Sequence, residues 1–93
     1  MISPESRPRL AKKARLRFDR KTKRTMVLFP ERGLELSSTA ADIVRLCTGE
    51  RTVAAIAELL LEKYSGRDRK SVVSEVVGFL NEMADRCLIE DVA

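Results

Sequence analysis

Residues 72–87 read VVSEVVGFLNEMADRC, and their apolar members repeat with the 3.6-residue period of an α-helix. At 100° per residue these side chains fill an arc of roughly 160°, whereas a surface helix usually buries a stripe of about 100°. The extra width has two explanations: the helix covers a larger core, or it forms one wall of an apolar groove. The apolar residues of the arc are Val72, Val73, Val76, Val77, Phe79, Leu80, Met83, Ala84 and Cys87.

The chain before residue 37 has the patterns of strands. Alternating polar and apolar side chains, or β-rich apolar runs, indicate three strands, at residues 15–19, 25–29 and 33–37. Pro30 lacks a backbone donor and Gly33 is conformationally free, so a turn is expected at residues 30–33. Residues 1–9 show no apolar periodicity and are expected to form a flexible N-terminal tail. Residues 10–93 would then form a single domain.

From residue 37 onward the period changes to that of helices. Each of three helical segments follows a good N-cap residue, which is Ser37 or Ser38, then Thr52, then Asp68. After the third helix, residues 88–89 can add a short closing strand. This order predicts an α+β fold that is winged helix-turn-helix-like, with a small three-stranded antiparallel sheet followed by three helices.

The charge of the chain is unevenly divided. Residues 1–24 contain ten basic and two acidic side chains, and residues 25–93 contain eight basic and twelve acidic ones, giving +8 and −4. The basic segment is either a solvated arm or a surface for an acidic partner or nucleic acid. The sequence has no apolar run of about 18 residues and no secretory signal, so we expect a cytoplasmic protein without membrane contact.

The sequence offers little for catalysis. It contains no histidine, no Gly-rich phosphate loop and no cluster of side chains with metal-ligand spacing. Cys47 and Cys87 lie in apolar helical patterns, which favours buried thiols in a reducing compartment over a disulfide or redox pair. We therefore expect no enzyme activity, no metal and no cofactor.

Two kinds of binding remain open. A winged-helix nucleic-acid-binding protein would insert the third helix into the major groove, but Glu75, Glu82 and Asp85 on its outward face would repel phosphate. An extended peptide fits better, because it can pair with the edge of the third strand beside an apolar helix. Alternatively, the closing strand, or a second copy in a homodimer, covers the surplus apolar surface.

An ordered series of residues with preserved spacing runs from about Pro8 to Ile89. Its landmarks are Arg15, Leu16, Arg17, Asp19, Val27, Leu28, Pro30, Glu31, Arg32, Leu34, Leu36, Ala41, Ile43, Leu46, Cys47, Gly49, Arg51, Thr52, Val53, Ile56, Val76, Phe79, Leu80, Leu88 and Ile89. In this series the chain resembles the PqqD family, the small peptide chaperones of pyrroloquinoline quinone (PQQ) biosynthesis. Thr48 and Glu75 depart from the pattern, since the family often has Asp at both places.

The resemblance implies a fold and a function. It implies a recognition element for ribosomally synthesised and post-translationally modified peptides (RiPPs), which binds its precursor peptide as an added strand. The peptide would be PqqA, presented to the radical-SAM enzyme PqqE, and the chaperone itself would need no cofactor. The basic residues 12–24 are a candidate surface for that enzyme. The implied peptide-binding residues are Gly33, Leu34, Glu35, Leu36, Ser37, Val72, Val73, Val76, Val77, Leu80 and Met83.

Overall fold

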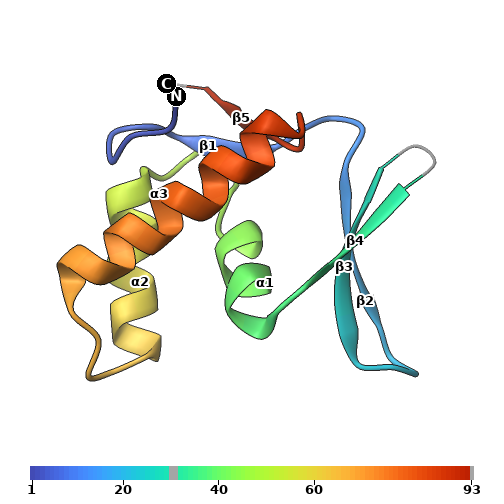
Figure 1. Ribbon diagram of the computed structural model, residues 1–93, viewed down its shortest axis with the longest axis horizontal. Coiled ribbons are helices and arrows are strands. Elements are labelled where there is room, and N and C mark those ends of the chain that lie inside the picture. Colours follow the sequence, from blue (N-terminus) through green and yellow to red (C-terminus); the bar gives the residue numbers. More distant parts are fainter. Residues whose placement is uncertain (30–31, 93) are drawn as a thin grey trace.

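Three antiparallel strands form the sheet that the alternating segments predict (Figure 1). The computed structural model describes residues 1–29 and 32–92, and places these strands as β2 (Arg15–Asp19), β3 (Arg24–Phe29) and β4 (Arg32–Leu36). Val27 of β3 pairs with Leu16 on one side and Leu34 on the other, so the three share one face of the sheet. Of the turn expected at residues 30–33, residues 30 and 31 lie outside the described part, and the other two belong to β4.

Three helices follow the sheet. They are α1 (Ser38–Arg45), α2 (Val53–Lys63) and α3 (Arg69–Asp85). The predicted caps are confirmed: the side chains of Ser37, Thr52 and Asp68 accept backbone N–H groups three residues ahead, at 3.1, 3.2 and 3.1 Å. In the part of the chain that the structure describes, no helix has the length and apolar character needed to cross a membrane.

The core lies between the helices and one face of the sheet. α3 packs mainly against α2, and α1 lies between α2 and the strands β3 and β4 (Figure 1). The largest fully buried side chains include Ile56 of α2, Leu80 and Met83 of α3, and Val27 of β3. The sheet and helices thus form the expected α+β arrangement, with α3 passing close to β4.

The N-terminal residues differ from the flexible tail expected for residues 1–9. β1 (Pro8–Leu10) pairs antiparallel with β5 (Ile89–Asp91), so the closing strand joins the start of the chain and not the three-stranded sheet. This pairing joins opposite ends of the sequence, and a segment of three residues is too short to show a period.

Residues 1–7 are held by their backbone. The carbonyl groups of Pro4 and Ser6 accept the N–H groups of Ala54 and Val53 at 3.0 and 2.9 Å. These are donors in the first turn of α2, which have no partner within the helix. Ile2 is only 4% exposed and belongs to the core. The N-terminal segment therefore caps α2 and completes the core.

The two cysteines differ in their surroundings. Cys47 is buried as expected, and its thiol donates to the carbonyl of Ile43 at 3.1 Å. Cys87 is exposed, so the expectation of a buried thiol is wrong there. α3 ends at Asp85, and Cys87 follows with a positive φ of 61°, which turns its side chain away from the helical arc. Both thiols are free.

Candidate functional site

β4 is an edge strand. Among the described residues it pairs with β3 on one side, and its other edge has no strand beside it. Such an edge presents backbone N–H and C=O groups to which an extended chain can bind. Leu36 is 8% exposed and faces the helices together with Leu34, as their alternation predicts. Glu35 points to the opposite face, where its carboxylate lies 3.0 Å from the guanidinium of Arg24.

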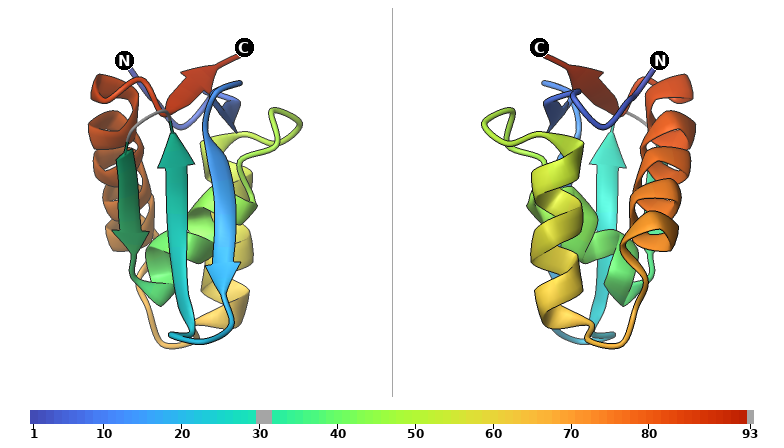
Figure 2. Two further views of the ribbon diagram at one scale, coloured as in Figure 1. Left: turned by 90° about the vertical axis from the view of Figure 1, so that its right-hand side faces the viewer. Right: turned by 90° about the vertical axis from the view of Figure 1, so that its left-hand side faces the viewer.

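A hollow of about 180 Å³ lies between β4 and α3. In Figure 2, β4 forms the side of the sheet nearest α3, while α2 lies toward the side of β2. Successive residues from Leu34 to Ser37 line the hollow, so it lies beside the free edge of β4. Its lining residues are Leu34, Glu35, Leu36, Ser37, Ala40, Phe79, Glu82, Met83 and Arg86.

A second hollow, of about 190 Å³, lies between α1, the end of α2 and α3. Its walls are mainly apolar, with Ile43 from α1, Leu60 from α2 and Val76 from α3. Arg67 and Glu75 also line it, and their side chains form an ion pair at 2.6 Å. The remaining lining residues are Ser37, Thr39, Ala40, Tyr64, Val72 and Phe79.

The two hollows share Ser37, Ala40 and Phe79. They are therefore adjacent, and together they make up a depression that begins at the edge of β4 and follows α3 toward its first turn. We call this depression the β4–α3 groove. Its floor and walls are mostly apolar, whereas charged side chains such as Glu82, Arg86 and the Arg67–Glu75 pair supply its polar contacts.

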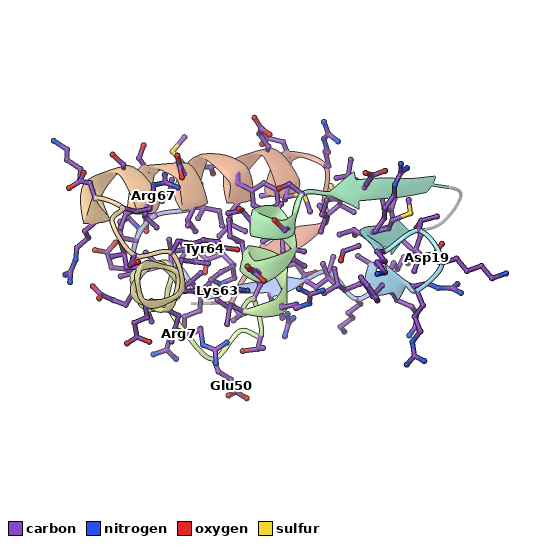
Figure 3. The ribbon with its side chains drawn as sticks, turned by 90° about the horizontal axis from the view of Figure 1, so that it is seen from below. Arg7, Asp19, Glu50, Lys63, Tyr64 and Arg67 are labelled. Carbon is purple, nitrogen blue, oxygen red and sulfur yellow. The ribbon has the colours of Figure 1, made fainter. Side chains whose placement is uncertain are left out.

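A charged cluster holds Tyr64 in the wall of the groove. Figure 3 shows Lys63 and Tyr64 reaching from the end of α2 toward α1. The Tyr64 hydroxyl donates to the carboxylate of Asp42, which also accepts from Lys63 at 2.9 Å and from Arg45 at 3.5 Å. Burial raises the pKa of Asp42, but the hydrogen bonds from Tyr64 and Lys63 and the nearby positive charges outweigh it and lower the pKa overall. The ionised carboxylate therefore ties α1 to α2.

The structure brings most of the implied peptide-binding residues together, but not all of them. Leu80 is fully buried beneath the groove. Val73 and Val77 line neither hollow. Gly33 lies on the other face of the sheet, where an added Cβ would be 3.0 Å from Cε of Met26. The implied residues that do line the groove are Leu34, Glu35, Leu36, Ser37, Val72, Val76 and Met83.

Phe79 is a groove residue that is absent from the implied set. It belongs to the apolar arc of the third helix, and it is one of the three residues common to both hollows. Its place in the arc was a usable signal. By contrast, Ala40, Ile43 and Tyr64 come from the other two helices, and no pattern in the sequence shows that these helices lie beside α3.

The opposite flank of α3 lies against the protein's own N-terminal segment. Asn81 follows Val77 by one helical turn, and its side-chain oxygen accepts the backbone N–H of Ile2 at 2.9 Å. Val73 and Val77 are half-buried and pack against the core. The wide apolar arc therefore has two neighbours: the core and N-terminal segment on one flank, and the groove on the other.

Comparisons with known proteins agree with this architecture. The family model of coenzyme PQQ synthesis protein D (PqqD) matches residues 24–89. A PqqA binding protein of Rhodopseudomonas palustris (strain HaA2) is 41% identical over 85 residues, which cover 91% of this chain and 82% of that protein.

Two solved structures are similar. One is the solution structure of the PqqD truncation of Methylobacterium extorquens PqqCD, a functional stand-alone RiPP recognition element; its TM-score is 0.83 at 30% identity, covering 97% of this chain and 95% of that chain. The other is the crystal structure of PqqD from Xanthomonas campestris, with a TM-score of 0.58 at 27% identity, covering 95% of this chain and 97% of that chain. These matches confirm the predicted α+β fold and the family resemblance. The chain belongs to the PqqD family.

Proposed function

We propose that this protein is a non-catalytic, cytoplasmic peptide chaperone of PQQ biosynthesis. It binds the ribosomal precursor peptide PqqA as an added strand on β4 and presents it to the radical-SAM enzyme PqqE. The observation that carries the proposal is the free edge of β4 running beside an apolar groove. Membership of the PqqD family, and a relative that is named as a PqqA binding protein, support the choice of peptide.

Strand addition uses both parts of this site. Backbone groups of the guest pair with the edge of β4, each hydrogen bond contributing about 0.5–1.5 kcal/mol. Every second side chain of the guest then points toward the groove, where Phe79, Met83 and Val76 offer apolar contacts. Burial of one large apolar side chain contributes about 1.5–3 kcal/mol. The backbone thus supplies general affinity, and the groove supplies selectivity for a guest with apolar side chains at alternate positions.

Two properties of the chain support a binding role without catalysis. The sequence has no histidine, the usual general base. Burial raises the pKa of the Cys47 thiol to about 12, so this cysteine stays protonated at neutral pH and is a poor nucleophile. Cys87 is exposed, but it lies outside the groove.

The charge of α3 argues against nucleic acid as the ligand. Glu75, Glu82 and Asp85 are all exposed on this helix. In a helix-turn-helix protein, the equivalent surface approaches phosphate groups, and carboxylates there would repel them. An apolar groove flanked by carboxylates has the chemistry of a peptide site instead.

Titration of isotope-labelled protein with unlabelled PqqA tests the proposal. We expect amide shifts concentrated in residues 33–37 and 68–86, because these residues contain β4 and α3. A peptide with the same composition in scrambled order is the control and should shift them much less. Shifts confined to residues 7–24 would indicate a purely electrostatic contact and would contradict strand addition.

A further inference from the structure

The outer face of the three-stranded sheet is uncovered. All three helices lie on the other side, as Figure 2 shows, and no described helix or strand packs over the outer face. β2 and β3 carry alternating side chains, so half of their residues point to this face and away from the core. The groove lies between the inner side of β4 and α3, so the two surfaces meet only at Glu35, which lines the groove and pairs with Arg24 on the outer face.

An apolar strip runs along the middle of the outer face. Met26 and Leu28 alternate with the buried Val27 on β3, are only half-buried, and do not belong to the core cluster. Gly33 of β4 stands directly opposite Leu28. A Cβ at Gly33 would lie 3.0 Å from Met26 Cε and 3.2 Å from Leu28 Cδ2, so both side chains lean over the glycine. Met26, Leu28 and Gly33 therefore form one low apolar strip. A larger residue at position 33 would push the side chains of Met26 and Leu28 apart.

Two arginines border this strip. Arg15 is paired with Leu28 and Arg17 with Met26 in the β2–β3 register, so all four residues share the outer face. Both arginines are exposed, and neither forms an ion pair with another described residue. At the end of the strip nearer the β2–β3 turn, Arg24 of β3 pairs with Glu35 of β4 at 3.0 Å. Asp19 lies two residues after Arg17 on the same face of β2 and interacts with its charge. Arg15 therefore has the least compensated positive charge on this face.

We propose that this outer sheet face is a second docking surface, which binds an acidic protein surface that carries an apolar side chain. Carboxylates of the partner would pair with Arg15 and Arg17, and its apolar side chain would cover Met26 and Leu28. The choice of partner rests on the proposed function: we assign the acidic surface to the enzyme that receives the peptide. The groove and the outer face point in different directions, so both partners can be bound at once.

The same observations disfavour two other occupants. Nucleic acid would use the arginines, but its phosphates have no use for an apolar strip, and the described part of this face has no aromatic side chain on which bases could stack. A second copy docked face to face would have to supply carboxylates for these arginines, but Asp19 and Glu35, the described carboxylates of this face, already lie beside Arg17 and Arg24.

Charge reversal at Arg15 and Arg17 tests the proposal. The variants are Arg15→Glu combined with Arg17→Glu, Met26→Ser alone, and a control of Arg69→Glu combined with Lys70→Glu, which makes the same change in net charge at the start of α3. For each variant, affinity is measured separately for purified PqqE and for PqqA, and an amide spectrum verifies the fold. We expect the β2 double variant to bind PqqE more than tenfold more weakly and Met26→Ser severalfold more weakly. Both should bind PqqA within twofold of the wild type, and the control should bind PqqE within twofold.

Other outcomes would overturn the docking surface. Equal weakening by both double variants would show long-range attraction to net charge, and unchanged PqqE binding would show that the face is not used. An unchanged Met26→Ser variant would remove the apolar strip from the interface. Duplex DNA binding that is lost only in the β2 double variant would assign the face to nucleic acid. If the wild-type protein binds PqqA but not PqqE, the proposed presentation to PqqE and this docking surface are refuted, and peptide binding in the groove is not. If it fails to bind PqqA, only the proposed peptide binding in the groove is refuted.

Discussion

Replacing Phe79 by alanine should separate peptide binding from folding. The ring of Phe79 is shared by both hollows of the β4–α3 groove and is half-buried, so one part of it packs against the core and another part faces the groove. Truncation to alanine removes both contacts. The part that faces the groove is the part that a bound peptide would cover.

The size of the effect follows from that exposed part. An aromatic side chain presents on the order of 200 Å², of which roughly a third is open at a half-buried position, so a guest covers on the order of 60 Å². At about 25 cal/mol per Å², this area corresponds to about 1.5 kcal/mol and a roughly tenfold weaker affinity for the peptide. The lost core packing should lower the free energy of unfolding by about 1–2 kcal/mol, less than for a fully buried phenylalanine.

Val77→Ala is the matched control, because Val77 is also a half-buried residue of α3 but lies on the opposite flank. Isothermal titration calorimetry should show PqqA affinity reduced about tenfold by Phe79→Ala and changed by less than about twofold by Val77→Ala. Urea unfolding should show that both variants are modestly destabilised. Equal affinities for the two variants, whether both weakened or both unchanged, would refute the assignment of the groove to the Phe79 flank.

Three further changes test the scaffold. Asp42→Asn should lower stability by about 1–2 kcal/mol at pH 7, because a mostly buried carboxylate loses its charge-assisted hydrogen bonds. Folding lowers the pKa of Asp42 from 3.8, so the stability that its carboxylate contributes is present above about pH 4 and is lost at lower pH. Urea unfolding should therefore show a smaller difference in unfolding free energy between wild type and variant at pH 3 than at pH 7. Gly49→Ala should lower the free energy of unfolding by about 1–3 kcal/mol, and by more than Gly66→Ala does. Both glycines have a positive φ, but only Gly49 is crowded, with Val92 Cγ2 3.3 Å from a new Cβ. A smaller loss of stability at Gly49 than at Gly66 would contradict this reasoning. Ile2→Ala should cost about 2–4 kcal/mol and lower the melting temperature by about 10 °C or more, whereas an unchanged melting temperature would show that the N-terminal segment does not contribute to the core.

Local chemistry made part of the fold predictable. The starts of the helices at Ser37, Thr52 and Asp68 depend on one side chain and a backbone group three residues away, so the sequence contains the whole signal. The strand around Leu36 is likewise visible in its alternation, and the strand around Val27 in its β-rich apolar run. The pairing of β1 with β5 was not predictable, because neither strand is long enough to show a period and the partners lie at opposite ends of the chain.

The groove was predictable only in part, for a related reason. Helical periodicity identifies the apolar arc of α3, but it does not reveal which neighbour covers each flank. In the fold, the N-terminal segment lies against one flank, where the backbone N–H of Ile2 donates to the side chain of Asn81. These two residues are at opposite ends of the sequence, and no local pattern connects them. Val73 and Val77 belong to the same apolar arc but line neither hollow, whereas Phe79, at the border of the two hollows, is absent from the implied set.

The pairing of β1 with β5 also affects how the domain can be attached to other proteins. The backbone N–H of Val92 donates to the carbonyl of Arg7 at 3.0 Å. Figures 1 and 2 show both termini at the end of the molecule away from the hairpin tip between β2 and β3, on opposite sides of that end. A tether at either terminus would leave from this end and would not cross the sheet face. For the same reason, a short linker could close the chain into a ring that is reopened at the hairpin tip, giving a circular permutant that retains its peptide-binding edge.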